Sequence, residues 1–477
     1  MARVFLVNPP SPEPVQSPLL SFCHLAASLR AEGHVVALHD ASATHAPKTH
    51  AAITARIAEF APDVVGLHLK TLHVQPAYAL ASELADRFVL VAGGPHATIV
   101  PAEPLAHGFR WVIRGEGEDA LCELADVFDG TREPASVAGL TWLDRGLVRH
   151  NPTRPFNMDL DRLAPPLSAL DLFDPSWYGR APIPGGTFPP VGILSSRGCP
   201  QACTFCSNDV TGRKFRYRSA SSVAAEIEIL RDRYGLPAFS FFDDSFAVGR
   251  RRVTELCDAI TAIGAPVTWT CTAHPSHLDR DVIASMKRAG CGGIDIGMES
   301  ADPKMLLRIG KGVTVERVLD VMRWAAELGV HTVVNLMFGW PDETDAELDA
   351  TIAFMDRAAP IAGGFNARGV VVPYPGTEIY ERNHVRFGFT DWWLREPPLD
   401  YLPFPTSWDE AEIVRAYGHD PALDRNFFQH PQHRVERIRE ALVIKAERTM
   451  EIQLRRCGLA STLGGDVAVG VPAAGAR

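Results

Sequence analysis

The chain has 477 residues, of which 46% are hydrophobic and 22% charged, and its formal net charge is -10. This composition is ordinary for a globular protein, and the length exceeds what one hydrophobic core supports, so we expect two or three domains. An acidic balance with Lys and Arg scattered singly argues against a nucleic-acid groove or an anionic membrane surface as the partner.

The amino terminus, MARVFLVNPP, carries one Arg and a short apolar run before two prolines. That run is too short for the apolar region of a signal peptide or for a spanning helix. We therefore expect a cytoplasmic protein.

Residues 1–150 alternate apolar runs with amphipathic helical patterns. The runs are VFLVNPP, VVALHDAS, VVGLHLK, FVLVAGGP and WVIRGEGE, and the segment 139–152 has the pattern of a hairpin that turns near Arg145-Gly146. Apolar strands alternating with helices indicate a parallel sheet covered on both faces. The sequence thus predicts an α/β domain of the doubly wound (Rossmann or flavodoxin-like) type, with its ligand at the carboxyl ends of the strands.

A Pro-rich linker is predicted over 151–190, followed by a second alternating series over 191–400. Six strand-helix units favour a partial (β/α)6 barrel of the TIM type, whose chemistry lies at the carboxyl ends of its strands. Residues 401–458 have a helical pattern, and 459–477 is a tail of small residues that we expect to be disordered.

Three of the nine cysteines lie in the stretch 197-RGCPQACTFCSND-209, directly after the first predicted barrel strand. Structural zinc sites have four ligands, usually in two separated pairs, and no second pair follows here. Three thiolates can instead hold a four-iron cluster and leave one iron open. We therefore predict that Cys199, Cys203 and Cys206 are iron ligands. The six isolated cysteines (Cys23, Cys122, Cys257, Cys271, Cys291 and Cys457) are predicted core residues.

The CxxxCxxC motif, with Phe205 before its last cysteine, resembles the signature of the radical S-adenosylmethionine (AdoMet) superfamily. This resemblance implies a [4Fe–4S] cluster that binds AdoMet through its open iron and cleaves it reductively to a 5′-deoxyadenosyl radical. It extends over the barrel, because FFDDSF, GIDIGMES, the KGVT segment at Lys311, NLMFGWPDET and VVVPYPGTEIY resemble family segments at the strand ends.

The resemblance assigns AdoMet contacts to six residues: Asp243, Asp244, Glu299, Ser300, Asn335 and Gly339. Each has a structural alternative. The two aspartates could cap a helix, Glu299 could belong to a surface ion pair, and Gly339, like Gly376, could serve a turn.

We predict that His274, Tyr374 and Asp244 are catalytic residues that act on the substrate. Relatives commonly carry an Arg near the place of His274, and a histidine there could transfer a proton near neutral pH or be a structural residue. Cys271 precedes His274 by three positions on a predicted strand, so the two side chains should face opposite sides.

The first domain closely resembles the cobalamin-binding domain that precedes the barrel in one radical AdoMet class. Its loops would hold the corrin through Asn8, Gly93, Gly94, His96, Gly115 and Glu116. No DxHxxG motif is present, so cobalamin would bind without the histidine that this motif supplies.

Four functions could use a three-cysteine motif of this kind. The leading one is cobalamin-dependent C-methylation of a small molecule, which we expect to belong to a specialised (antibiotic-type) pathway, with flavodoxin, ferredoxin or a reductase as electron donor. About 270 residues follow Cys206, fewer than we expect for a typical methylase, and this favours the alternative of radical dehydration, epimerisation or rearrangement, as in aminoglycoside diol dehydratases. An iron–sulfur redox sensor would not need the AdoMet segments. A methylthiotransferase would need a second three-cysteine cluster in the first domain.

Overall fold

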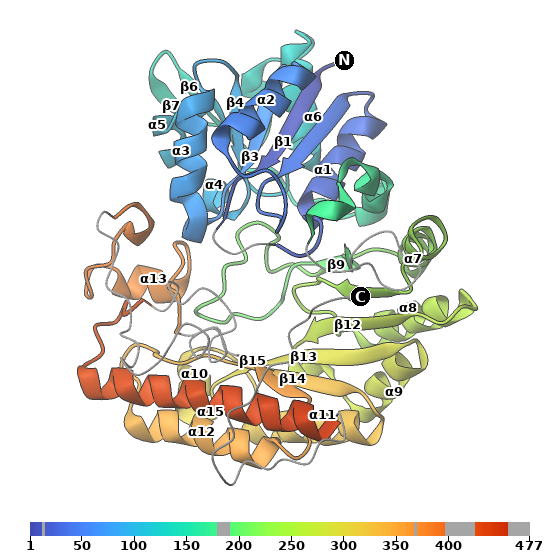
Figure 1. Cartoon of the computed structure of the whole chain (residues 1–477), viewed down its shortest axis with the longest axis vertical. Helices are drawn as coiled ribbons and strands as arrows, with labels where there is room; N and C mark the ends of the chain where they lie inside the picture. Colours follow the sequence, from blue (N-terminus) through green and yellow to red (C-terminus); the bar gives the residue numbers. More distant parts are fainter. Residues whose placement is uncertain (12–14, 179–190, 367–369, 396–424, 457–477) are drawn as a thin grey trace, which may run out of the picture.

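Two sheets organise the molecule, one above the other in Figure 1. The computed structural model describes residues 1–11, 15–178, 191–366, 370–395 and 425–456. The first domain contains a seven-stranded sheet and the second a six-stranded sheet, and two further strands form a separate two-stranded ribbon. Both sheets match the predicted α/β class.

The seven-stranded sheet has the order β2-β1-β3-β4-β5-β6-β7, and its first five strands are parallel. The strands are β1 (Arg3–Asn8), β2 (Val35–Asp40), β3 (Val64–His68), β4 (Leu90–Gly93), β5 (Trp111–Ile113), β6 (Leu140–Asp144) and β7 (Leu147–His150). The helices are α1 (Leu20–Ala31), α2 (His50–Phe60), α3 (Val74–Leu84), α4 (Pro95–Ile99), α5 (Glu103–Ala106) and α6 (Glu118–Phe128). The order reverses between β1 and β3, where doubly wound sheets place their ligands.

Strand β1 shows why this sheet needs helices on both faces. Val4 and Leu6 pack in one apolar core with α1 and α6, whereas Phe5 and Val7 pack in a second core with α2 and α3. Alternate side chains of a strand point to opposite faces of the sheet. A strand that is apolar along its whole length therefore needs a layer of helices on each face.

The predicted hairpin is confirmed as the β6–β7 pair, in which Asp144 faces Leu147. Arg145 and Gly146 both have positive φ, at 50° and 82°. This is the geometry of the two-residue turns that match strand twist.

The predicted linker is ordered between residues 160 and 177, where three short 3-10 helices follow one another: η3 (Leu160–Arg162), η4 (Pro166–Leu172) and η5 (Pro175–Trp177). Leu167 and Leu170 are fully buried with α1 in the core that also reaches the barrel. Residues 179–190 of the predicted linker lie outside the described residues.

The six-stranded sheet has the order β15-β14-β13-β12-β11-β8 and is parallel throughout. Its strands are β8 (Val191–Ile193), β11 (Ala238–Phe241), β12 (Thr268–Ala273), β13 (Cys291–Glu299), β14 (His331–Leu336) and β15 (Gly364–Asn366), and β9 (Ser196–Arg197) with β10 (Arg216–Tyr217) forms the ribbon. Its helices are α7 (Ala220–Tyr234), α8 (Arg250–Ala262), α9 (Arg280–Arg288), α10 (Pro303–Arg308), α11 (Val315–Glu327) and α12 (Asp345–Ala358). Neighbouring strands are consecutive and the edges β8 and β15 do not pair, as in a partial barrel.

The last part contains α13 (Glu378–Asn383), η7 (Trp392–Leu394) and the long helix α15 (Gln432–Arg456), which packs beside α12 and β15. The helical pattern predicted after residue 400 is thus confirmed for α15, whereas residues 401–424, Cys457 and the predicted tail 459–477 lie outside the described residues. The other five isolated cysteines are buried, as predicted.

The η7 segment is attached to the first domain. The Trp393 indole donates to Glu103, and Gln75 donates to the Trp393 carbonyl oxygen at 2.8 Å. Glu103 also accepts from Tyr78 at 2.8 Å and from His96 at 2.9 Å. The chain therefore returns to its first domain after the barrel is complete.

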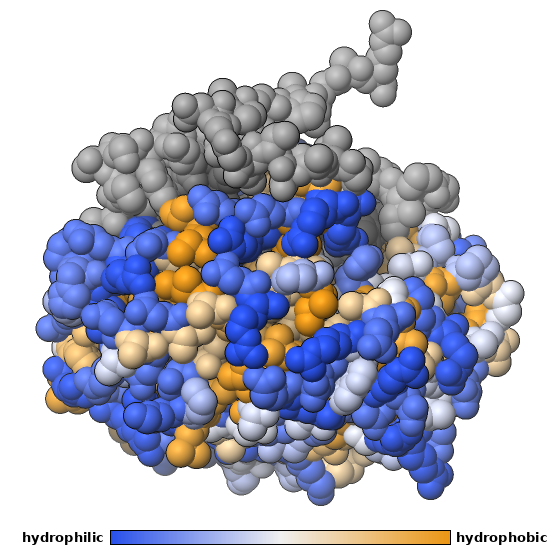
Figure 2. Space-filling model, turned by 90° about the horizontal axis from the view of Figure 1, so that it is seen from below, coloured by the Kyte–Doolittle hydropathy of each residue, from blue (hydrophilic) through white to orange (hydrophobic). Residues whose placement is uncertain are grey.

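Figure 2 shows the underside of the molecule, where hydrophobic residues are interspersed among hydrophilic ones over the helix layer of the barrel. No helix in the described part of the chain combines the length and apolarity that a membrane span requires.

Candidate functional site

The three predicted iron ligands lie on the loop that follows β9, between the barrel and the first domain. Backbone contacts fix this loop on two sides. Thr204 donates its amide to Ile309 at 3.0 Å and accepts from the amide of Ile379 at 2.9 Å. A Cβ atom at Gly310 would lie 2.9 Å from the carbonyl oxygen of Ala202, so only a glycine fits this approach.

The thiols of Cys199, Cys203 and Cys206 are close enough to influence one another. Burial raises the pKa of Cys206 to about 11, and the charges of the other two thiols add to this. Three neighbouring thiolates repel one another unless a cationic group binds them. No group of three or more His, Cys, Asp or Glu side chains among the described residues is arranged to hold a single metal ion. The donor set fits a cluster, in which each thiolate binds a different iron.

The Asp243-Asp244 pair after β11 braces the start of this loop. The carboxylate of Asp243 is buried and accepts from the amide of Ser195 at 2.7 Å and the hydroxyl of Ser196 at 2.7 Å, with Arg252 beside it at 3.4 Å. Asp244 accepts from the amide of Gly198 at 2.8 Å and from Thr211 at 2.9 Å. Both aspartates thus hold the chain on either side of β9.

Replacing Asp244 by Ala should loosen the cysteine loop, because two hydrogen bonds to a charged acceptor are lost, each worth about 1.5–3 kcal/mol. We expect the reconstituted variant to lose iron to a chelator roughly tenfold faster than the unaltered protein. Iron release followed by absorbance checks this, with the exposed Asp258→Ala on α8 as control. Equal release rates for all three proteins would contradict the bracing role.

A second group of predicted residues meets at the end of β13. Glu299 is buried, has φ 71° and pairs with Lys311 at 3.0 Å. A Cβ atom at Gly297 would lie 2.7 Å from both charged groups, so the glycine makes room for the ion pair. Lys311 also lies 5.9 Å from the centroid of the Phe205 ring in the cysteine motif. A non-glycine residue with positive φ at a strand end is typical of functional sites.

His274 contacts this group through the backbone of Lys311. Its Nε2 lies 2.9 Å from the carbonyl oxygen of Lys311 and its Nδ1 lies 2.7 Å from the hydroxyl of Ser276. Burial, with the charge of Lys311, lowers the pKa of His274 to about 4. Both ring nitrogens thus have protein partners, as the structural alternative requires, and a catalytic role remains a prediction. The side chain of Cys271 is buried on β12, and the side chain of His274 is buried just beyond that strand.

Two other predicted AdoMet contacts also have protein partners. The hydroxyl of Ser300 is fully buried 3.3 Å from Thr351, and Asn335 accepts from Asn366 at 2.8 Å. Their assignments to AdoMet remain predictions.

Gly339 and Tyr374 lie on the segments that follow β14 and β15. Gly339 has φ 72°, and its carbonyl oxygen is 3.1 Å from His430 Nε2. The Tyr374 ring lies 6.3 Å from that of Trp392. Their roles in the site also remain predictions.

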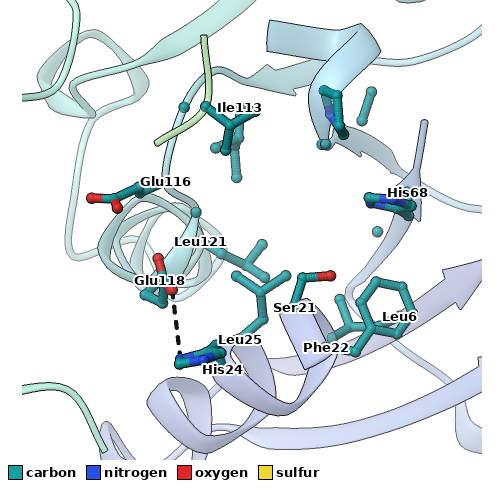
Figure 3. Close-up of a pocket in the computed structure, with 18 of the residues that line it drawn as sticks. Leu6, Ser21, Phe22, His24, Leu25, His68, Ile113, Glu116, Glu118 and Leu121 are labelled. Atoms are coloured by element: carbon teal, nitrogen blue, oxygen red, sulfur yellow. Dashed lines mark ion pairs between the residues drawn. The ribbon is translucent and has the colours of Figure 1, made fainter. Parts of the chain in front are cut away.

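A cavity of about 290 Å³ lies at the carboxyl edge of the first sheet. Figure 3 shows its walls: Leu6 and Ile113 from the strands, Phe22 and Leu25 from α1, and Leu121 from α6. Leu194 and Val210 come from the barrel side. Because its walls are mainly apolar, the cavity suits an apolar group.

The predicted cobalamin contacts divide into two sets. Gly93, Gly94, Gly115 and Glu116 line this cavity. Asn8 and His96 do not line it: Asn8 donates to Asp40 at 2.8 Å, and His96 lies against Thr71 and Glu103. These two side chains therefore hold the loops together, and a direct contact with a cofactor remains a prediction.

A buried ion-pair network joins this cavity to the cysteine loop. Arg197, two residues before Cys199, donates to Glu116 at 3.0 Å and also to Glu118, which is 3.9 Å from His24. Arg216 donates to Glu116 at 2.8 and 2.9 Å. Burial raises the pKa of Glu118, but the charge of Arg197 lowers it further, to about 2. The Glu118 carboxylate is therefore ionised at neutral pH.

Sequence reasoning missed several of these residues. His24, Glu118 and Arg197 meet across more than 70 positions of sequence, as does Arg216 with Glu116. His68, at the end of β3, also lines the cavity. One signal was available: Glu116 and Glu118 follow a strand end, where ligand-site residues gather.

Comparisons with known proteins agree with this arrangement. The family model described as Radical SAM superfamily matches residues 193–355, and the one described as B12 binding domain matches 16–125.

An uncharacterized methyltransferase of Pyrococcus horikoshii is 32% identical over 80% of this chain and 82% of its own length. The anaerobic magnesium-protoporphyrin IX monomethyl ester cyclase of Cereibacter sphaeroides is 27% identical over 70% of this chain and 55% of its own. The structure of the radical S-adenosylmethionine methyltransferase TsrM from Kitasatospora setae, with cobalamin and a [4Fe-4S] cluster bound, covers 81% of this chain and 78% of its own with a TM-score of 0.65 at 22% identity.

Proposed function

The chain belongs to the radical SAM enzymes that carry a B12-binding domain, and from this premise we propose that it transfers a methyl group from cobalamin to a carbon atom of a small molecule. Its cofactors are a [4Fe–4S] cluster, AdoMet and cobalamin. The observation that supports the proposal is the position of the cysteine loop next to the cavity of the first domain, because Arg197, Val210 and Thr211 flank the loop and line the cavity.

Each group of residues in the site has its own role in this reaction. Cys199, Cys203 and Cys206 hold the cluster, and its open iron faces AdoMet. Lys311 and Glu299 lie beside Cys203 and Phe205, where they can contact the polar parts of AdoMet. The residues that line the cavity, among them Gly93, Gly94 and Glu116, would hold part of the cobalamin.

The cofactors supply radical formation and methyl donation. In the overall reaction, one C–H bond of the substrate is replaced by a C–CH3 bond. One AdoMet ends as methionine and 5′-deoxyadenosine, and a second ends as S-adenosylhomocysteine. Two electrons come from an external donor such as a flavodoxin or ferredoxin. The protein holds the reacting groups in order and excludes water.

The test is anaerobic reconstitution with iron, sulfide and cobalamin, followed by incubation with CD3-labelled AdoMet, a reductant and a panel of small molecules. We expect bound cobalamin, 5′-deoxyadenosine and S-adenosylhomocysteine, and a product that carries CD3. A protein that cleaves AdoMet but never retains cobalamin would refute the proposal.

The similarity to a cyclase favours a second candidate, a radical reaction without methyl transfer. Dehydration, epimerisation or rearrangement would give 5′-deoxyadenosine without S-adenosylhomocysteine. The ratio of these two products therefore separates the candidates.

A further inference from the structure

His68 is a polar side chain on the wall of the apolar cavity. It ends β3, and Figure 3 shows its ring projecting from the strand end toward the middle of the cavity. Its ring packs edge-on against Phe22, with centroids 6.2 Å apart. No hydrogen bond joins the His68 ring to any of the residues that the structure describes.

The imidazole of His68 is neutral. Burial lowers the pKa of His68 to about 3, and the nearby Lys70 adds to this. A neutral imidazole has one N–H donor and one acceptor nitrogen. The His68 side chain is partly exposed and lines the cavity, so its N–H can donate a hydrogen bond to the cavity's occupant.

The backbone is shaped around this ring. A Cβ atom at Gly94 would lie 2.7 Å from His68 Nδ1 and 2.9 Å from Cε1, and Gly94 has φ 99°. Glycine is therefore required at position 94 both by the backbone angle and by the space that the ring occupies. The predicted role of Gly94 in cofactor binding thus acts through the position of His68.

The volume of the cavity limits which chemical groups can reach the His68 ring. About 290 Å³ admits a flat bicyclic base but not a corrin macrocycle, so the cobalt atom stays outside. We propose that His68 is a specificity-determining residue that donates a hydrogen bond to the ring nitrogen of the base on the cofactor's nucleotide side arm. This inference rests on the proposed function only in taking a corrinoid as the occupant.

The test compares two corrinoids that differ in whether the base of the nucleotide side arm has a ring nitrogen. Cobalamin carries benzimidazole with a ring nitrogen, whereas a phenolyl cobamide carries a base without one. We expect the unaltered, cluster-loaded protein to bind cobalamin roughly tenfold more tightly than the phenolyl form. His68→Phe should bind both with equal affinity, and His68→Gln, which keeps an N–H donor, should restore most of the preference.

Binding of the phenolyl cobamide serves as the folding control, because it does not depend on the hydrogen bond. If His68→Phe kept the tenfold preference, the proposal would be wrong. Electron paramagnetic resonance of the bound cob(II)alamin gives a second readout. A nitrogen splitting that is present in the unaltered protein and lost in His68→Phe would make His68 a cobalt ligand and also overturn it. Failure of the unaltered protein to bind either corrinoid would instead refute the proposed function.

Discussion

Replacing Cys203 by Ala should abolish the reductive cleavage of AdoMet. An iron that loses its thiolate is no longer held at the loop, and a cluster with two protein ligands cannot present AdoMet in a fixed position. The rate of 5′-deoxyadenosine formation should fall by at least about a thousandfold. Anaerobic reconstitution, reduction with dithionite and chromatography of the products measure this rate.

Cys122→Ala is the matched control for this variant. Cys122 is a buried cysteine of α6 in the first domain, and its removal deletes a thiol without touching the loop. We expect it to keep the iron content and the cleavage rate of the unaltered protein. Continued cleavage by Cys203→Ala would contradict the cluster assignment.

The second large effect is expected from Arg197→Met. Arg197 is buried between Glu116 and Glu118, so its removal leaves Glu118 as a buried carboxylate without its cationic partner. Removing one partner of a buried ion pair typically costs about 3–5 kcal/mol. Urea unfolding of the anaerobic protein should show a loss of this size. The double variant Arg197→Met, Glu118→Leu should recover a large part of it, because no unpaired charge remains.

The same network predicts how stability depends on pH. The pKa of Glu118 is about 2 in the folded protein against an ordinary value of 4.5, so its ionised form is stabilised by folding. That contribution is complete above pH 4.5 and is lost as the pH falls toward 2. We expect Glu118 to account for a loss of about 2 kcal/mol between pH 6 and pH 3. Arg197→Met should lack this part of the pH dependence, and an unchanged profile would contradict the pairing.

The strands and the cysteine motif could be predicted because their signals are local. Continuous apolar runs marked the parallel strands, and the turn at Arg145-Gly146 followed from a short polar break between two runs. The spacing of Cys199, Cys203 and Cys206 predicts an iron site in the same local way.

The contacts between the domains could not be predicted because their partners are far apart in sequence. Arg197 and Glu118 are separated by 79 positions, and Arg216 and Glu116 by 100. The lone His68 was likewise indistinguishable from a core histidine. His274 shows the opposite case, in which a motif position predicted for chemistry has protein partners on both ring nitrogens.

The contact between Trp393 and Glu103 spans 290 positions and has a consequence for synthesis on the ribosome. Domains generally fold in order as they emerge. The first domain can form its sheet early, with Glu103 bound to Tyr78 and His96. Its third donor arrives only after the whole barrel has been translated. The first domain to begin folding is therefore completed by a segment that is made only after the barrel, so a nascent chain released before residue 393 leaves this domain unfinished.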